Sequence, residues 1–232
     1  MRTAQFYGAG FPYRNINELS GKLIVLEGND AVGRSSHIDL LKQWLEREGY
    51  AVSNTGLNRS ELTTAGLDSA KEGHTLSPTT MSLFYATDFA DRLENQIIPA
   101  LKAGFIVLSD RYFYSVIARD VVRGADPQWA RKVYGFALKP DLTLYLRAEI
   151  PTLVSRIVHG RGFNYWEAGM DIRCADNIYD SFCVYQSKLR DQLDKMAEEY
   201  GFISIDANRP IINIFEDLRM EIRNLFISDK HL

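Results

Sequence analysis

Two glycines five residues apart, followed by a basic residue and two serines, form the stretch best suited to chemistry. In "LEGNDAVGRSS", residues 26–36, Gly28, Gly33 and Ser35 fit the phosphate-binding pattern G-x-x-x-x-G-K-[ST], and Arg34 stands where lysine is usual. Glycines let successive main-chain N–H groups converge on phosphate oxygens, and the following helix adds its N-terminal partial positive charge. The stretch therefore predicts a nucleotide triphosphate site, against the alternative of a strand–helix turn without a ligand.

Arg34 keeps the charge of the usual lysine but changes its shape. Lysine supplies a compact charge between the β- and γ-phosphates, whereas arginine is planar, longer and able to bind phosphate through two N–H groups. Nucleotide binding and phosphoryl transfer are therefore separate questions for this loop. Ser35 is placed to ligate Mg²⁺. The predicted ATP-binding residues are Gly28, Asn29, Asp30, Ala31, Val32, Gly33, Arg34, Ser35 and Ser36.

The second candidate is "LSDRY", residues 108–112, where an apolar stretch ends in Asp110. Ligands of open α/β sheets bind at the carboxyl ends of the strands. A carboxylate there can hold Mg²⁺ through water, and Arg111 beside it can bind a phosphate. Alone, this pair is typical of a charged strand end, but the loop at 28–36 favours the functional interpretation.

Strands and helices alternate along the chain, and they must position these residues. Apolar runs predict strands at 22–27, 50–55, 105–109, 141–146 and 202–206. Helical spacing predicts helices at 35–48, 78–102, 127–138, 178–200 and 211–225. This order predicts an α/β fold: a single domain with a five-stranded parallel sheet and helices on both faces. The polar, Gly-containing residues 159–177 predict a short lid between two helices.

Composition fits a globular protein: 46% of the 232 residues are hydrophobic and the net charge is −3. That charge gives no support for a nucleic-acid polymer as partner. Without a long apolar run or a signal core we expect no membrane segment and a cytoplasmic location, with Cys174 and Cys183 as reduced thiols. Residues 1–20 are expected to be a mostly irregular N-terminal extension, followed by one domain at 21–232.

Three stretches together resemble the thymidylate kinase family of P-loop nucleoside monophosphate kinases. "EGNDAVGRSS", "DRYFYS" and "KPDLTLYL" occur in the family's order and at similar separations, and the likeness covers most of residues 22–207. The resemblance implies a single-domain P-loop kinase fold. It implies that ATP is the phosphate donor, that Mg²⁺ is the metal, and that the enzyme is a homodimer. It also implies a nucleoside monophosphate as acceptor, with dTMP as the first choice.

The resemblance also implies roles for single residues. Asp30 matches the acidic loop residue near the acceptor's sugar and phosphate, and Asp110 with Arg111 matches the pair near Mg²⁺ and the acceptor phosphate. Ser115 matches the serine that follows in that motif. Family arginines in the lid close on the ATP phosphates, and the matching candidates are Arg161, with Arg156 as a second, and the lid acid Glu167.

Departures from the family pattern gather on the acceptor side. "TGLNRS", residues 55–60, replaces the family's T-R-E-P-G-G and keeps only Thr55, with Arg59 as a shifted replacement for the lost charge. Phe89 stands where the family has an arginine, and it either stacks on the acceptor or belongs to the core. Arg92 follows three residues later, nearly one helical turn, and is a candidate partial substitute for that arginine. Arg119 stands where the family has a tyrosine, and the next residue, Asp120, stands where the family has a glutamine.

These observations leave two functional classes open. The first is a kinase in which Arg34, Asp110, Arg111 and Arg161 promote transfer while Asp30, Phe89, Arg111, Ser115 and Arg119 bind the acceptor. The second is a P-loop nucleotide-binding protein with altered acceptor specificity or little kinase activity. A GTPase is disfavoured because no N-K-x-D base motif follows the third predicted strand.

Overall fold

The computed structural model describes residues 2–13, 16, 18–57, 60–73 and 76–229. The chain divides into two compact units: Met1–Val25 with Lys42–Asp141, and Leu26–Leu41 with Leu142–Leu232. Strand β3 (Lys22–Gly28) and helix α1 (Arg34–Arg47) run from one unit into the other.

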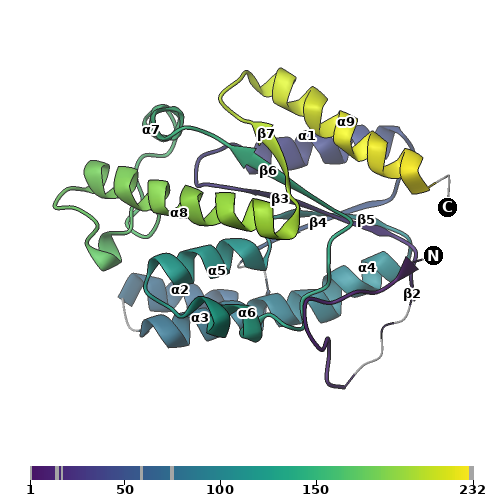
Figure 1. Cartoon of the computed structure of the whole chain (residues 1–232), viewed down its shortest axis with the longest axis horizontal. Helices are drawn as coiled ribbons and strands as arrows, with labels where there is room; N and C mark the ends of the chain where they lie inside the picture. The colour runs from purple at the N-terminus through teal and green to yellow at the C-terminus, as the bar shows by residue number, and fades with distance from the viewer. Residues whose placement is uncertain (1, 14–15, 17, 58–59, 74–75, 230–232) are drawn as a thin grey trace. The chain divides into compact units, whose positions relative to one another are not determined.

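The first unit contains the beginning of β3, two further strands of the main sheet and most of the shorter helices. Its elements are β1 (Arg2–Thr3), β2 (Glu18–Leu19), β4 (Val52–Gly56), α2 (Thr64–Gly73), α3 (Pro78–Arg92), η1 (Leu93–Ile97), α4 (Ile98–Lys102), β5 (Ile106–Asp110), α5 (Phe113–Val122) and α6 (Pro127–Val133). Helix α3 packs against α5, and α5 packs against α6 (Figure 1).

The helix predicted at 78–102 is continuous but not uniform. Ser77 caps α3 by accepting a hydrogen bond from the Thr80 N–H, and Pro78 takes the first turn, where a missing N–H costs nothing. The chain then passes through the π-helical segment η1 before α4. Such segments interrupt the α-helical hydrogen-bond pattern and are frequent near functional sites.

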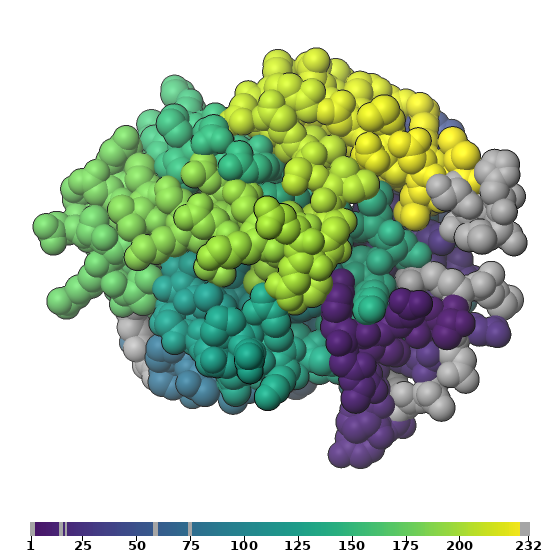
Figure 2. Space-filling model, viewed as in Figure 1, coloured from purple at the N-terminus to yellow at the C-terminus, as the bar shows by residue number. Residues whose placement is uncertain are grey.

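The second unit contains the end of β3, the phosphate loop and the C-terminal elements. These are β6 (Leu142–Arg147), α7 (Ile150–Val158), η2 (Met170–Ile172), α8 (Ile178–Tyr200), β7 (Ile203–Asp206) and α9 (Ile211–Asp229). Helix α9 packs on β6 and β7, and α8 lies on the other side of these strands (Figure 1). The outer side of α9 (yellow in Figure 2) is at the surface and carries exposed apolar side chains: Ile211, Ile212, Met220 and Ile227.

The main sheet has five strands in the order β4-β5-β3-β6-β7, as the alternating sequence pattern predicts. Strands β4 and β5 are parallel, with Gly56 opposite Asp110, and β6 and β7 are parallel, with Arg147 opposite Asp206. Six of the seven residues of β3 are buried, which explains its continuous apolar run. The order and the strand–loop–helix start give the P-loop kinase fold.

The N-terminal residues are packed on the first unit. Residues 1–20 are predicted to be mostly irregular, but β1 and β2 within them form a short antiparallel pair. The Gly8 N–H donates to the Gly135 carbonyl at 2.8 Å, and the Tyr7 and Tyr114 hydroxyls lie 2.5 Å apart. The Tyr7 ring also meets Phe113 edge to face at 5.2 Å between centroids. This segment therefore contributes to the aromatic core of the unit.

The expectations for a membrane segment and for the two cysteines concern features that the structure describes. None of the helices within the described part of the chain is both long enough and apolar enough to cross a membrane. Both cysteines are free and partly exposed.

Candidate functional site

The phosphate loop of the second unit has the backbone that its glycines predict. Gly28 and Gly33 have φ of 148° and 98°, and Ala31 between them has φ of 63° although it is not glycine. A Cβ on Gly28 would lie 2.6 Å from the Leu146 carbonyl oxygen, so no other residue fits there. Because non-glycine residues rarely adopt positive φ, Ala31 indicates a conformation held for function.

Arg34 is buried and turned onto its own loop. Its guanidinium Nη1 donates to the Gly28 carbonyl at 2.5 Å and also to the Asn29 carbonyl. The residue is only 8% exposed. These carbonyls therefore compete with any phosphate for the Arg34 guanidinium. Ser35 and Ser36, in the first turn of α1, are exposed.

Two further side chains fix the loop from the outside. Arg156 on α7 donates to the Val32 carbonyl at 2.8 Å and to the Ala207 carbonyl at 2.7 Å, and its burial lowers its pKa. His37 lies 2.8 Å from the Gly33 carbonyl through Nδ1, and it is 2% exposed. Burial lowers the His37 pKa, which favours the neutral ring.

The lid segment carries its predicted charged pair. Arg161 is exposed, and its Nη2 donates to both carboxylate oxygens of Glu167 at 2.6 and 2.5 Å. The Arg161 side chain is 61% exposed and that of Glu167 is 18% exposed. Because water reaches the guanidinium, the pair contributes little to stability, and exchanging Glu167 for a phosphate would cost little. Arg156, the second lid candidate, instead supports the loop.

Helix α8 adds a residue that the sequence analysis did not single out. Gln186 is fully buried and hydrogen-bonded to Asn29, Asp30 and Glu167. In the sequence, Gln186 is a polar residue that lies next to the apolar stripe of Phe182, Tyr185 and Leu189, which helical spacing places in the core. A polar residue at the edge of such a stripe is the pattern that indicates a buried hydrogen-bonding role.

In the first unit, Asp110 and Arg111 are held at the end of β5. Asp110 is the last residue of the strand and 8% exposed. Arg111 has φ of 71°, a rare value for a residue with a side chain. Its carbonyl accepts from the Ser109 hydroxyl at 2.6 Å, and its Nη1 donates to the Ser115 hydroxyl at 3.0 Å. Ser115 thus orients Arg111 from the first turn of α5.

Phe89 belongs to an aromatic cluster of the first unit. Its ring centroid lies 4.8 Å from that of Tyr112 and 5.7 Å from those of Tyr134 and Phe136. Phe89 is 0% exposed, so its side chain has no surface for an acceptor in this conformation. Of the two interpretations offered by the sequence, the structure places it in the core.

Arg92 does not replace the family arginine at a surface. It pairs with Asp88 at 2.9 Å, and both side chains are 0% exposed. Arg92 Nη1 also donates to the Thr55 hydroxyl at 3.3 Å, and the Ser60 N–H donates to Asp88 at 2.9 Å. The Arg92 guanidinium therefore stabilises the interior of the first unit. Arg59, the other suggested replacement, lies outside the described residues.

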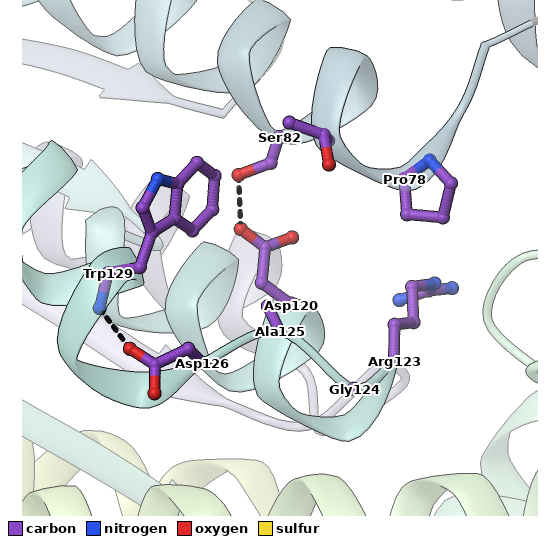
Figure 3. A pocket seen from close by; sticks show the side chains of 9 residues that line it. Pro78, Ser82, Asp120, Arg123, Gly124, Ala125, Asp126 and Trp129 are labelled. Carbon is purple, nitrogen blue, oxygen red and sulfur yellow. Dashed lines mark hydrogen bonds between the residues drawn. The ribbon is translucent and has the colours of Figure 1, made fainter.

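A pocket of about 340 Å³ lies where α3 begins, α5 ends and α6 begins (Figure 3). The Ser82 hydroxyl donates to Asp120 Oδ2 at 2.5 Å, while the Asp126 carboxylate caps α6 through the Trp129 N–H at 2.6 Å. Burial raises the pKa of Asp120, against the hydrogen bond from Ser82 and the charge of Arg123. Asp120 directly follows the predicted acceptor residue Arg119, which is partly exposed.

The donor atoms present fit magnesium rather than a transition metal. The described residues hold no group of three or more His, Cys, Asp or Glu side chains suited to a metal ion. Mg²⁺ commonly keeps several waters and binds through one or two protein oxygens together with substrate phosphates. The exposed hydroxyl of Ser35 and the carboxylate of Asp110 are oxygen donors of that kind.

The predicted site residues thus fall into two groups. The second unit holds Gly28 to Ser36 and Arg161, and the first unit holds Phe89, Asp110, Arg111, Ser115 and Arg119. In the second unit, the loop is in contact with Arg156 and His37. In the first unit, Arg111 is in contact with Ser115. Phe89 lies in the aromatic core of the first unit.

Known proteins resemble the chain over most of its length. The family model described as thymidylate kinase matches residues 26–218. The chain is 42% identical over 205 residues to a probable thymidylate kinase 2 of Saccharolobus solfataricus, covering 87% of this chain and 95% of that protein. It is 32% identical to a probable thymidylate kinase of Thermococcus gammatolerans (85% and 94% covered) and 28% identical to a thymidylate kinase of Shouchella clausii (90% and 98% covered).

Proposed function

The chain belongs to the thymidylate kinase family, and we propose that it transfers the γ-phosphate of ATP to a nucleoside monophosphate, with dTMP as the principal acceptor. The products are ADP and the nucleoside diphosphate. The observation that carries this proposal is the loop from Gly28 to Ser35, with three positive φ values ahead of α1. That backbone suits a triphosphate held by main-chain N–H groups.

On the donor side, the roles follow from position. Main-chain amides of residues 28–35 bind the β-phosphate, and Ser35 would ligate Mg²⁺. Arg34 neutralises γ-phosphate charge once its guanidinium exchanges the Gly28 carbonyl for phosphate oxygens. Arg161 does the same from the lid after leaving Glu167. The loop residue Asp30 faces the acceptor's sugar and phosphate.

On the acceptor side, Arg111 binds the acceptor phosphate in the orientation set by Ser115. Asp110 would hold Mg²⁺ through water, and Arg119 contacts the acceptor. Phe89 is left out of this role because it is 0% exposed. The Asp120 carboxylate beside the pocket is an acceptor of hydrogen bonds, so bases that present N–H groups belong in any acceptor panel.

The mechanism needs positioning and charge neutralisation. A phosphate oxygen of the monophosphate is already a nucleophile, so no base is required. Mg²⁺, when bound, neutralises charge on the β- and γ-phosphates. The arginines stabilise charge on the transferring group, and lid closure over 159–177 excludes water, which limits ATP hydrolysis.

A second candidate is a nucleotide-binding protein with little kinase activity. One observation favours it: the Arg34 guanidinium is bound to loop carbonyls and is 8% exposed. In that case ATP binds but the transition state lacks one cation.

The test is phosphoryl transfer from ATP and Mg²⁺ to dTMP, dUMP, dCMP, dAMP and dGMP, with Arg34→Lys and Arg34→Ala beside the parent. Transfer by the parent, strongly reduced in Arg34→Ala, supports the kinase. ATP binding without transfer to any acceptor would reject it. Activity only in Arg34→Lys would identify a disabled relative and support the second candidate.

The same family premise supports a homodimer and a cytoplasmic location. Sedimentation equilibrium of the purified chain tests the first, and a monomer at micromolar concentration contradicts it. Fractionation of cells tests the second.

A further inference from the structure

Gln186 uses every hydrogen-bonding group of its side chain. Its Oε1 accepts from the Asn29 Nδ2 at 2.9 Å and from the Asp30 N–H at 3.3 Å. Its Nε2 donates to Asp30 Oδ2 at 2.9 Å and to the Glu167 carbonyl at 2.8 Å. A glutamine amide has two donor hydrogens and two acceptor lone pairs, so this residue is fully satisfied.

The loop end of this network involves two residues. The main-chain carbonyl of Gln186 also accepts a hydrogen bond from Asn29 Nδ2 at 2.9 Å. Both the main chain and the side chain of Gln186 therefore bind the Asn29 amide. Asn29 and Asp30 are 1% and 2% exposed. A buried carboxylate with a fixed donor has a defined orientation. Gln186 therefore sets the direction of Asp30, which the proposed function places near the acceptor.

The lid end of the network is anchored on the same helix. The Ala168 carbonyl accepts from the Ser181 hydroxyl at 2.7 Å, and Gly169, with φ of 65°, packs so closely on the Tyr185 ring that a Cβ would lie 2.6 Å away. Glu167, immediately before them, carries the pair with Arg161. The second half of the lid is thus fixed to α8, while Arg161 remains exposed.

We propose that Gln186 is a positioning residue that couples the phosphate loop to the lid. It aims the Asp30 carboxylate and ties the loop to the Glu167 main chain, so that a change in the loop on nucleotide binding reaches the lid through one amide group. This inference rests on the proposed function for its kinetic consequences. It does not rest on that function for the coupling itself.

The chemistry requires an amide of this length. Glutamate lacks both N–H donors and would place a second negative charge beside Asp30. Leucine fills the space but removes the donor to Asp30 Oδ2 and the side-chain acceptor of the Asn29 amide and the Asp30 N–H, while the main-chain contact with Asn29 stays. Asparagine retains the amide but is one methylene shorter. Leu193→Ala, a buried apolar position on the same helix, is a matched control for loss of stability alone.

The first experiment measures kinetics of Gln186→Leu, Gln186→Glu and Gln186→Asn. We expect kcat to fall about 10- to 100-fold because Asp30 is misplaced, with a higher acceptor KM and an ATP KM within about twofold of the parent. The share of ATP hydrolysed without transfer rises because the lid no longer follows the loop. Equal losses in Leu193→Ala, at equal thermal stability, would overturn the proposal.

The second experiment needs no acceptor. Hydrogen exchange is followed by mass spectrometry with a non-hydrolysable ATP analogue and Mg²⁺. The parent should gain protection at 28–36 and at 159–177, and Gln186→Leu only at 28–36. Protection of both stretches in the variant would overturn the coupling. If the parent phosphorylates no acceptor, the proposed function fails and this readout still decides the role of Gln186. Should Gln186→Leu not fold, Gln186→Asn provides the comparison.

Discussion

The phosphate loop and the acceptor region both depart from the family pattern, but the structure accommodates the departures differently. In the second unit, Arg34 remains inside the loop that it modifies, and its guanidinium is bound to the carbonyls of Gly28 and Asn29. In the first unit, Phe89 and Arg92 have become parts of the interior. The loop is made of backbone and tolerates a changed side chain, whereas a contact that depends on one side chain is lost when that side chain is buried.

A site built from main-chain groups and a site built from side chains respond differently to substitution. A substitution within a main-chain cradle leaves most phosphate contacts in place, since they come from N–H groups. A substitution in a side-chain pocket changes both shape and charge. Variants in the first unit at Arg92 should therefore act on folding, and variants in the loop should act on catalysis.

The largest effect is expected for Arg92→Met. The variant removes the cation that pairs with the Asp88 carboxylate at 0% exposure, so we expect a loss of about 3–5 kcal/mol in the free energy of unfolding. Urea denaturation measures it. The double variant Asp88→Asn/Arg92→Met should recover much of the loss. A stable Arg92→Met protein with a raised acceptor KM would instead mean that Arg92 serves the acceptor, and the comparison would fail.

Gly28→Ala should act on catalysis. A Cβ 2.6 Å from the Leu146 carbonyl must shift the loop, so kcat/KM for ATP should fall about 100-fold as aligned N–H donors are lost. The control is Gly49→Ala, which has φ of 91° but open space around its Cβ and so tests backbone strain alone. Equal kinetic losses in the two variants would contradict the loop assignment.

Ser115→Ala should sharpen the account of the acceptor side. Removing the hydroxyl that accepts from Arg111 costs about 1 kcal/mol of orientation, which is about a fivefold rise in acceptor KM. The ATP KM should not change. Steady-state kinetics at varied acceptor and varied ATP measure both values, and an ATP effect alone would assign Arg111 to the donor.

The smallest effect concerns pH and the loop support His37. Burial lowers its pKa in the folded protein below the unfolded value of about 6.5, so folding favours the neutral ring. The stability it contributes is complete above pH 6.5 and is lost as the pH falls through the folded pKa. The urea midpoint should therefore drop less between pH 7.5 and 5.5 in His37→Gln than in the parent. An identical drop would exclude His37 as the titrating group.

Much of the fold could be predicted from local pattern. The apolar run 22–27, the helix cap at Ser77 and the stripe from Ile178 to Tyr200 each announce an element, and the structure has β3, α3 and α8 there. Helices α2 and α5 were not predicted, because their buried residues depend on neighbours distant in sequence. The π-helical η1 was also missed, since the apolar spacing continues through it.

The sequence by itself determined the phosphate loop, because glycine spacing controls backbone conformation and the contacts are made by the backbone. It also determined the family and the alternation of strands and helices. Only the tertiary structure decided the fate of side chains that could serve a site or a core. Phe89 is packed among aromatic rings, Arg92 is paired with Asp88, and Gln186 joins the loop to the lid, because burial and hydrogen-bond partners are set by contacts that local sequence does not contain.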